Sequence, residues 1–338
     1  MRFVNFFEGK ILNFRSFVLL SVATVMVSCF GLESDLEKQI KIDDKIIAEY
    51  LDNNGIQAQK HSTGFYYMQL PPAEAYLNRQ SDDGAMALAT SYLEGAGAQL
   101  KNNDIVSFYY TISKLDGSKI ESNEEGEEPV KFRLMSQTII PEGLDYGIKL
   151  MKVGEQYRFY MPSYLAYGSY GSRQFSSHTN FIIDVWVVGV ETPTEIDDVQ
   201  RDSIESYVSE RYENYKIYPS GLCFIDSVPG TGIKPFMGDR VVIDFERKYL
   251  DNKLIKSSEG AQFMLGSGQA VDGLDEGLKL MKEGGVSVLI MPASIAFKQS
   301  VCVIPQAARE ELVYNRLISY EVLPYSIVKY VVKLRYVN

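Results

Sequence analysis

An internal repeat constrains this chain more than any other feature of its sequence. The stretch "EGLDYGIKLMKVGEQYRFYMP", residues 142–162, recurs as "DGLDEGLKLMKEGGVSVLIMP" at an offset of 130 residues. Upstream, "NDIVSFYYTISKLDG" from Asn103 recurs as "GDRVVIDFERKYLDN" from Gly238. Further upstream, "TGFYYMQL" from Thr63 recurs as "SGLCFIDS" from Ser220. Because the three segments keep their order, the sequence predicts two homologous domains.

The spacing between the repeated segments locates two insertions. The offset falls from 157 to 135 residues between the two upstream pairs, which indicates 22 extra residues in the first repeat, within 71–94. In the second repeat, residues 298–325 replace the shorter 168–180 after the aromatic motif. Both insertions are candidate contact elements.

Each repeat mixes strand and helix signals. Runs such as "IVSFYYTI", "FIIDVWVVGV" and "VKYVVKLRYV" are rich in β-branched and aromatic residues, as is typical of strands. Between them, Leu144, Ile148 and Met151 share one apolar helical face, and Gly154 is placed to end that helix. The second repeat has the same pattern. The sequence therefore predicts an α+β fold, with an antiparallel sheet curled around one short helix in each domain.

The domain boundaries follow from these patterns. We expect the first domain at 59–193 and the second at 217–338. A helical pattern precedes each of them, in 30–58 and in the linker 194–216.

The N-terminal residues have the pattern of an export signal. Basic residues precede the apolar run 16–28, which has signal-peptide length and is too short to span a bilayer. The run ends at Cys29 after small and apolar residues, which resembles a bacterial lipobox. We therefore expect 1–29 to be a lipoprotein signal and Cys29 to be lipidated. Plain secretion with an incidental Cys29 is the alternative.

Charge and side-chain inventory exclude several kinds of site. The 338 residues carry a net charge of −10, and nucleic acids and anionic membrane surfaces need a basic face. Only Cys223 and Cys302 remain after the expected signal. They either form a disulfide or stay free, with Cys223 a buried thiol in an apolar run. His61 and His178 lie far apart in sequence, so we expect no metal site, no cofactor and no His-dependent nucleophile.

The linked motifs resemble the FKBP-type peptidyl-prolyl cis-trans isomerases. The first repeat reads "YTISKLDGSKIESN", "FRLMSQTIIPEGLDYGIKLMKVG", "YMPSYLAYG" and "FIIDVWVVGV", and the second "FERKYLDNKLIKSS", "FMLGSGQAVDGLDEGLKLMKEGG", "IMPASIAF" and "IVKYVVKL". The similarity covers residues 60–191 and 217–337. It implies two FKBP-like domains that bind proline-containing polypeptides.

Prolyl isomerisation needs no acid, base or nucleophile. Rotation about an Xaa–Pro bond meets a barrier of about 18–20 kcal/mol that arises from amide resonance. An apolar pocket that takes the amide out of water favours its less polar, twisted state. An aromatic-rich loop such as "YLAYGSYG" suits that reaction, although it is also ordinary β-rich core and turn.

The resemblance assigns site residues to the first domain. Tyr110 matches the pocket tyrosine, Ile140 the residue whose backbone N–H holds the substrate carbonyl, and Tyr167 the hydroxyl donor. The remaining pocket positions depart in part from the family pattern, since three aromatic positions carry aliphatic residues; they are Ile120, Glu121, Leu144, Phe175 and Ile183.

The second domain departs further from the family pattern. Lys256 takes the acidic position, Phe297 replaces the tyrosine donor and Lys298 follows it in place of glycine. We therefore expect no strong catalysis there. Its implied pocket consists of Phe245, Ile255, Val271, Leu274, Phe297 and Tyr330.

Two functions follow from the resemblance. The first is a prolyl isomerase that assists protein folding in the bacterial cell envelope, with its activity in the first domain. The alternative is an inactive FKBP-like lipoprotein that binds a peptide or an envelope protein. Both predict an exported protein that reaches the membrane through its lipid anchor alone, and we expect this to be the outer membrane. Neither predicts a nucleic-acid partner.

Overall fold

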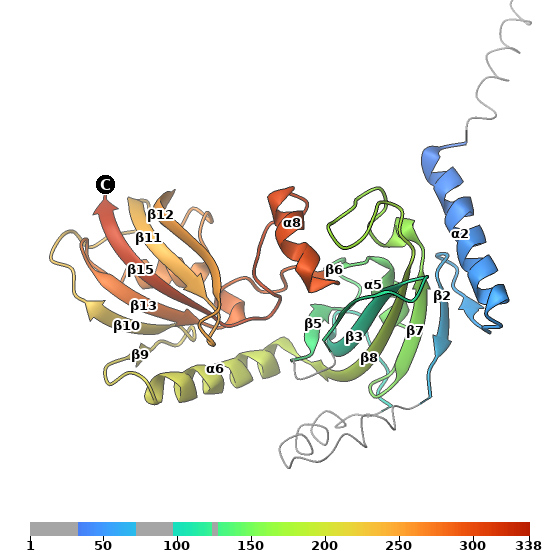
Figure 1. Cartoon of the computed structure of the whole chain (residues 1–338). Coiled ribbons are helices and arrows are strands. Elements are labelled where there is room, and N and C mark those ends of the chain that lie inside the picture. Colours follow the sequence, from blue (N-terminus) through green and yellow to red (C-terminus); the bar gives the residue numbers. More distant parts are fainter. Residues whose placement is uncertain (1–32, 72–96, 124–127) are drawn as a thin grey trace, which may run out of the picture.

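The computed structural model describes residues 33–71, 97–123 and 128–338. Within these residues, two antiparallel sheets and a few short helices form two domains, which confirms the predicted α+β fold. The domains lie side by side, and helix α6 (Pro193–Ser209) runs along both of them (Figure 1). The expected signal with Cys29, and nearly all of the expected insertion at 71–94, fall outside the described residues.

The first domain is a strongly curved antiparallel sheet. In its order β1-β2-β7-β8-β3-β4, strands distant in sequence lie next to each other, and β5 pairs with β3. The strands are β1 (Gln59–Lys60), β2 (Tyr66–Gln69), β3 (Ile105–Lys114), β4 (Lys119–Ser122), β5 (Val130–Arg133), β7 (Gln156–Met161) and β8 (Phe181–Glu191).

Helix α5 (Gly143–Ile148) fills the inner face of this sheet, and the short turn η1 (Ser163–Leu165) follows β7. Leu144, Ile148 and Met151 are fully buried, as their spacing predicts. The helix ends well before Gly154, because the N–H groups of the residues after Ile148 bond three residues back and tighten the chain into turns. Gly154 has a left-handed φ of 90° in the turn that leads into β7, not at the helix end.

The second domain repeats this arrangement. Its sheet has the order β12-β11-β15-β13-β10-β9, and helix α7 (Asp272–Leu278) and turn η2 (Ala293–Ile295) correspond to α5 and η1. The strands are β9 (Lys216–Ile217), β10 (Cys223–Val228), β11 (Arg240–Lys248), β12 (Leu254–Met264), β13 (Val286–Met291) and β15 (Val328–Val337).

A helix covers the outer face of each sheet. Helix α2 (Asp35–Asn53) packs Ile47 and Leu51 against the first sheet, and α6 packs Ile204 and Val208 against the second. Each begins with a capping box, in which a Ser or Thr and the Glu three residues later exchange hydrogen bonds with backbone N–H groups. Among the described residues, no helix has the length and apolar character needed to cross a membrane.

The second-domain insertion reaches across to the first domain (Figure 1). It contains β14 (Cys302–Val303), the turn η3 (Gln306–Ala308) and α8 (Arg309–Tyr314), and β14 pairs in parallel with β6 (Ile139–Ile140) of the first domain. Most of its buried apolar side chains join the hydrophobic core of the first domain; they are Cys302, Val303, Ile304, Ala308, Leu312 and Ile318. Val322, on its returning part, joins the core of the second domain.

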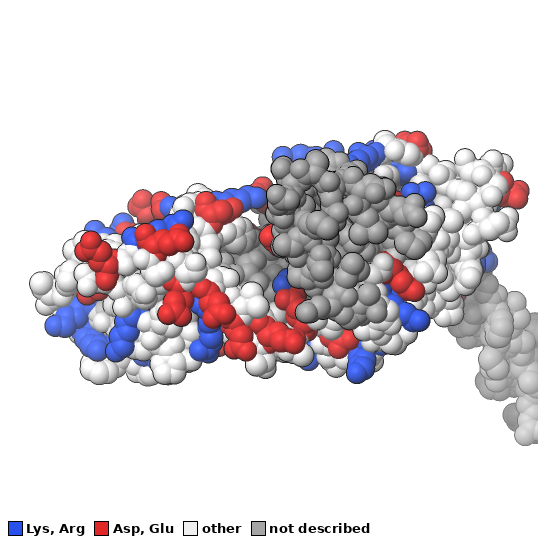
Figure 2. Space-filling view, turned by 90° about the horizontal axis from the view of Figure 1, so that it is seen from below, with Lys and Arg blue, Asp and Glu red and all other residues white. Residues whose placement is uncertain are grey.

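The described surface is mixed in charge. Seen from below, acidic and basic side chains are interspersed over the second domain and α6 (Figure 2). Cys223 and Cys302 are both buried and free, which confirms the expectation of a buried thiol for Cys223.

Candidate functional site

Tyr167 lies at the centre of an aromatic cluster on the loop after η1. Its ring centroid is 4.5 Å from that of Phe175, and Phe181 packs edge-on to both rings. The Tyr167 hydroxyl donates a 2.9 Å hydrogen bond to the backbone carbonyl of Ile304 in the insertion. Burial raises the pKa of Tyr167 well above its ordinary value, so the hydroxyl stays protonated and able to donate.

Tyr110 and Glu121 form a second polar contact at the core of the first domain. Tyr110 is fully buried on β3, and its hydroxyl donates to the Glu121 carboxylate on β4. Burial first, and then the charge of Glu121, raise the pKa of Tyr110, so this phenol is neutral as well. The Tyr110 backbone N–H donates to Asn123 at 2.7 Å, and this buried amide is a site neighbour that the motifs did not indicate.

Ile140 holds the insertion through its main chain. The register of β6 and β14 pairs Ile140 with Val303, and the Ile304 N–H donates to the Ile140 carbonyl at 2.8 Å. One step earlier, the Cys302 N–H donates to the Thr138 carbonyl at 2.7 Å. The structure thus uses Ile140 as an acceptor, and its expected role as an N–H donor to a substrate carbonyl stays a prediction.

Glu121 binds the insertion on the other side of Pro305. The backbone N–H groups of Gln306 and Ala307 donate to its two carboxylate oxygens at 2.6 and 3.0 Å. Pro305 is buried, and its peptide bond with Ile304 is cis. Tyr167 therefore binds the carbonyl before this proline, and Glu121 binds the amide groups after it.

The remaining first-domain positions form the apolar surroundings of Tyr110, Glu121 and Tyr167. Ile120 and Ile140 are partly buried, and the others are buried in the same core that takes in the insertion; they are Leu144, Phe175 and Ile183. The structure thus brings together every first-domain residue that the sequence singled out.

In the second domain, the corresponding space is filled by a side chain. Arg247 on β11 is buried, with its guanidinium 4.6 Å above the Phe297 ring and 5.8 Å from the Tyr330 ring. It also lies within 3.6 Å of the Glu321 carboxylate. The expected residues gather around it or in the same core; they are Phe245, Ile255, Val271, Leu274, Phe297 and Tyr330.

The acidic position of the second domain has an inverted charge pair. Lys256, which replaces the acidic residue, forms a 3.0 Å ion pair with Glu321 from the returning part of the insertion. Neither Arg247 nor Glu321 was predicted as a site residue from the motifs. One signal for Arg247 was present, because it occupies the strand position at which the first repeat has the buried Ile112.

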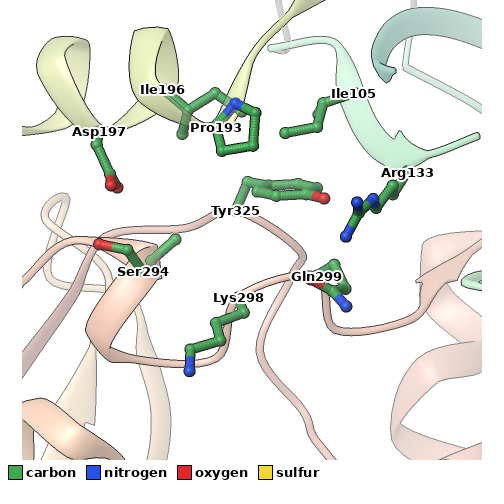
Figure 3. A pocket seen from close by; sticks show the side chains of 10 residues that line it. Ile105, Arg133, Pro193, Ile196, Asp197, Ser294, Lys298, Gln299 and Tyr325 are labelled. Atoms are coloured by element: carbon green, nitrogen blue, oxygen red, sulfur yellow. The ribbon is translucent and has the colours of Figure 1, made fainter. Parts of the chain in front are cut away.

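Open space lies between the domains instead. A cavity of about 290 Å³ is enclosed by the first sheet, the start of α6 and the base of the insertion (Figure 3). Tyr325 lies at its centre, below Pro193 of α6 and beside Arg133 of the first domain (Figure 3). Neither Tyr167 nor Glu121 lines this cavity, so it is separate from the candidate site.

The segment that binds at the candidate site was not predicted from the sequence either. The repeat offsets predict that 298–325 is an insertion and a candidate contact element, but not that it contacts Tyr167. The available signal was "VIPQA", residues 303–307, an apolar residue followed by the only proline in the middle of the insertion. Within the described residues, no group of His, Cys, Asp and Glu side chains is arranged to hold a metal ion.

Comparison with known proteins agrees with these motifs. The family model of the FKBP-type peptidyl-prolyl cis-trans isomerases matches residues 97–188 and 232–318. The chain is 37% identical over 99 residues, 29% of its length, to the isomerase FkpA of Aeromonas hydrophila, and 23% identical over 211 residues, 61% of its length, to FKBP9 of Mus musculus. These matches span 36% and 33% of the two relatives.

Among solved structures, FkpA from Escherichia coli is 21% identical with a TM-score of 0.34, over 43% of this chain and 60% of that one. The three FKBP domains of wheat FKBP73 are 17% identical with a TM-score of 0.30, over 83% of this chain and 99% of that one.

Proposed function

The chain belongs to the FKBP-type peptidyl-prolyl cis-trans isomerase family, and on that premise we propose that its first domain isomerises Xaa–Pro bonds of exported polypeptides. The observation that carries this proposal is the hydrogen bond from the Tyr167 hydroxyl to the Ile304 carbonyl, the carbonyl of an Ile–Pro bond. A site that holds this group in its own chain has the shape and donors to hold it in another polypeptide.

The first-domain site can lower the rotation barrier without a titrating group. Its aliphatic and aromatic surroundings keep water from the Xaa–Pro amide, which favours the twisted state of lower polarity. Tyr167 fixes the acyl side of the bond while the prolyl side turns. Because burial keeps Tyr167 neutral, the donor is present over the whole ordinary pH range.

The second domain has a different role in this proposal. Arg247 fills the space that a prolyl ring would need, and Phe297 offers no hydroxyl to a carbonyl. We assign it a binding and positioning role, in which it presents the insertion to the first domain.

The expected location completes the proposal. The apolar run 16–28 and Cys29 support export and lipid anchoring in the bacterial envelope, where the slow isomerisation of Xaa–Pro bonds can limit the folding of exported proteins. Mass spectrometry of the mature protein tests this part, since a lipid-modified N-terminal cysteine at position 29 is expected and an unmodified N-terminus contradicts it.

Tyr167→Phe tests the catalytic proposal in the chain of residues 30–338 with residues 301–318 replaced by a short Gly-Ser linker, because the Ile304 carbonyl of that segment binds the same hydroxyl. Removing the hydroxyl deletes one hydrogen bond worth about 1 kcal/mol, so we expect kcat/KM to fall roughly three- to tenfold. Catalysed exchange is measured by NMR on an Ile–Pro peptide at millimolar concentration. The matched control is Tyr330→Phe, which removes a buried tyrosine hydroxyl next to Arg247 in the second domain and should leave the rate unchanged.

The same assay includes the alternative function. A folded wild-type chain that binds the peptide at Tyr167 but leaves its exchange at the uncatalysed rate would be a peptide-binding protein and not an isomerase.

A further inference from the structure

We propose that the insertion at 298–325 is an intramolecular pseudosubstrate, which occupies the prolyl site of the first domain and which a polypeptide substrate must displace. The term "substrate" rests on the proposed function. The occupancy of the first-domain site by the insertion rests only on the contacts between them. It adds a regulatory contact between the two domains and a sequence preference for the site.

The insertion binds as an extended peptide on both sides of Pro305. Before the proline, β14 adds to β6 in parallel, with main-chain bonds from Cys302 and Ile304. This is strand addition, in which main-chain hydrogen bonds supply affinity and side-chain pockets supply specificity. After the proline, Glu121 accepts two successive N–H groups.

Burial shows that this contact is a close one. Cys302, Val303 and Ile304 are at most 2% exposed, and all three pack into the core of the first domain. Farther along, α8 contacts the loop around the site, since Glu311 pairs with Arg173 at 3.2 Å. A second polypeptide cannot reach Tyr167 while these residues are in place.

Hydrogen bonds within the insertion itself hold its shape. Arg309 is buried, and its guanidinium donates to the carbonyls of Val301, Tyr320 and Val322, which lie on the outgoing and returning parts of the segment. At its base, the Tyr325 N–H donates to the Lys298 carbonyl at 2.9 Å. A preorganised segment loses little conformational entropy on binding, so it competes well against a free peptide.

The tether strengthens this competition. A ligand linked to its site acts at an effective concentration near the millimolar range. Peptides bind only to the fraction of molecules in which the insertion is displaced, and their apparent affinity falls by that fraction. The bound segment also indicates which sequences compete best, namely a branched aliphatic residue before proline and two unhindered N–H groups after it.

The two buried cysteines allow a direct test. In the chain of residues 30–338, only Cys223 and Cys302 carry thiols. Burial raises the pKa of each thiol to about 12, so neither should react with a disulfide reagent in the folded protein. Cys302 lies in the docked segment, whereas Cys223 lies in the second-domain sheet and serves as the internal control.

The experiment follows labelling of each thiol by mass spectrometry as the peptide Val-Ile-Pro-Gln-Ala is added. We expect Cys302 labelling to accelerate about tenfold or more at millimolar peptide, with Cys223 unchanged. The peptide Val-Ile-Ala-Gln-Ala should have a much smaller effect. If Cys302 labelling is unaffected by peptide, or if both cysteines accelerate together, the proposal is wrong.

Point variants keep the test independent of peptide affinity. Glu121→Gln removes a charged acceptor from two N–H groups and should speed Cys302 labelling about tenfold without peptide. Glu311→Gln, the matched control at the exposed Arg173 pair, should change it less than about twofold. Equal rates in the two variants contradict the proposal.

The outcomes separate this proposal from the proposed function. Release of Cys302 by peptide without catalysis supports the pseudosubstrate and rejects the isomerase. Catalysis during which Cys302 stays protected supports the isomerase and rejects the pseudosubstrate.

Discussion

Arg247 and Ile112 occupy the same strand position of the two repeats, and this exchange changes what each pocket can do. The buried Ile112 leaves the first site open to a prolyl segment. Arg247 instead places a cation among aromatic rings and pairs it with Glu321. A buried charge of this kind stays in place only with its partners, so the second pocket is closed by its own side chain.

Arg247→Ala should destabilise the second domain. The change leaves Glu321 with one cationic partner fewer and exposes the Phe297 ring, so we expect the free energy of unfolding to fall by about 2–3 kcal/mol. Urea denaturation measures it. Arg211→Ala, which removes an exposed arginine 4.5 Å above the Tyr207 ring, is the control and should cost less than about 0.5 kcal/mol. An equal loss of unfolding free energy in the two variants would show that Arg247 does not stabilise the second domain.

The two site tyrosines predict a decline of stability at alkaline pH. Burial raises the pKa of Tyr110 and Tyr167 in the folded chain, whereas both titrate near pH 10 when unfolded. The unfolded state therefore releases protons first, and stability that is complete below pH 10 is lost as the pH rises above it. Between pH 9 and 11, Tyr167→Phe should lose less unfolding free energy than the wild type. An equal loss would mean that the Tyr167 hydroxyl is not buried.

At the scale of elements, the sequence predicts what is periodic and misses what is not. The spacing of Leu144, Ile148 and Met151 reports a buried helical face, because burial repeats with the helical turn. The offsets between the repeats locate the insertion at 298–325, because it interrupts a shared pattern. Its docking depends on β6 and β14, two strands of two residues each. Strands of two residues are too short to show a periodic sequence pattern. A contact between the two repeats also produces no pattern within the sequence of either repeat.

Some residues of the candidate site could likewise be predicted from the sequence, and others could not. Tyr110, Glu121 and Tyr167 lie in linked motifs, so their gathering could be predicted from the resemblance. The role of Arg309 could not, because a charged residue in an insertion is ordinarily a surface residue. Only the three carbonyls around it in the folded chain explain why it is buried.

At the scale of the whole molecule, helix α6 and the insertion connect the two domains (Figure 1). Helix α6 packs on the second sheet, and its Gln200 side chain accepts the Ala293 N–H and donates to the Tyr325 carbonyl, at the base of the insertion. The insertion then reaches the prolyl site of the first domain. In our proposal, the second domain holds the insertion in place and sets how often that site is open, so that any activity would depend on both domains together.

The most direct test of this account compares kcat/KM of the chain of residues 30–338 with that of a variant in which residues 301–318 are replaced by a short Gly-Ser linker. The account predicts that the variant is faster by about tenfold or more, because its site is always open. Adding Tyr167→Phe to the variant should remove most of that gain. An unchanged kcat/KM in a folded variant would contradict the account, since the site would then be equally accessible with and without the insertion.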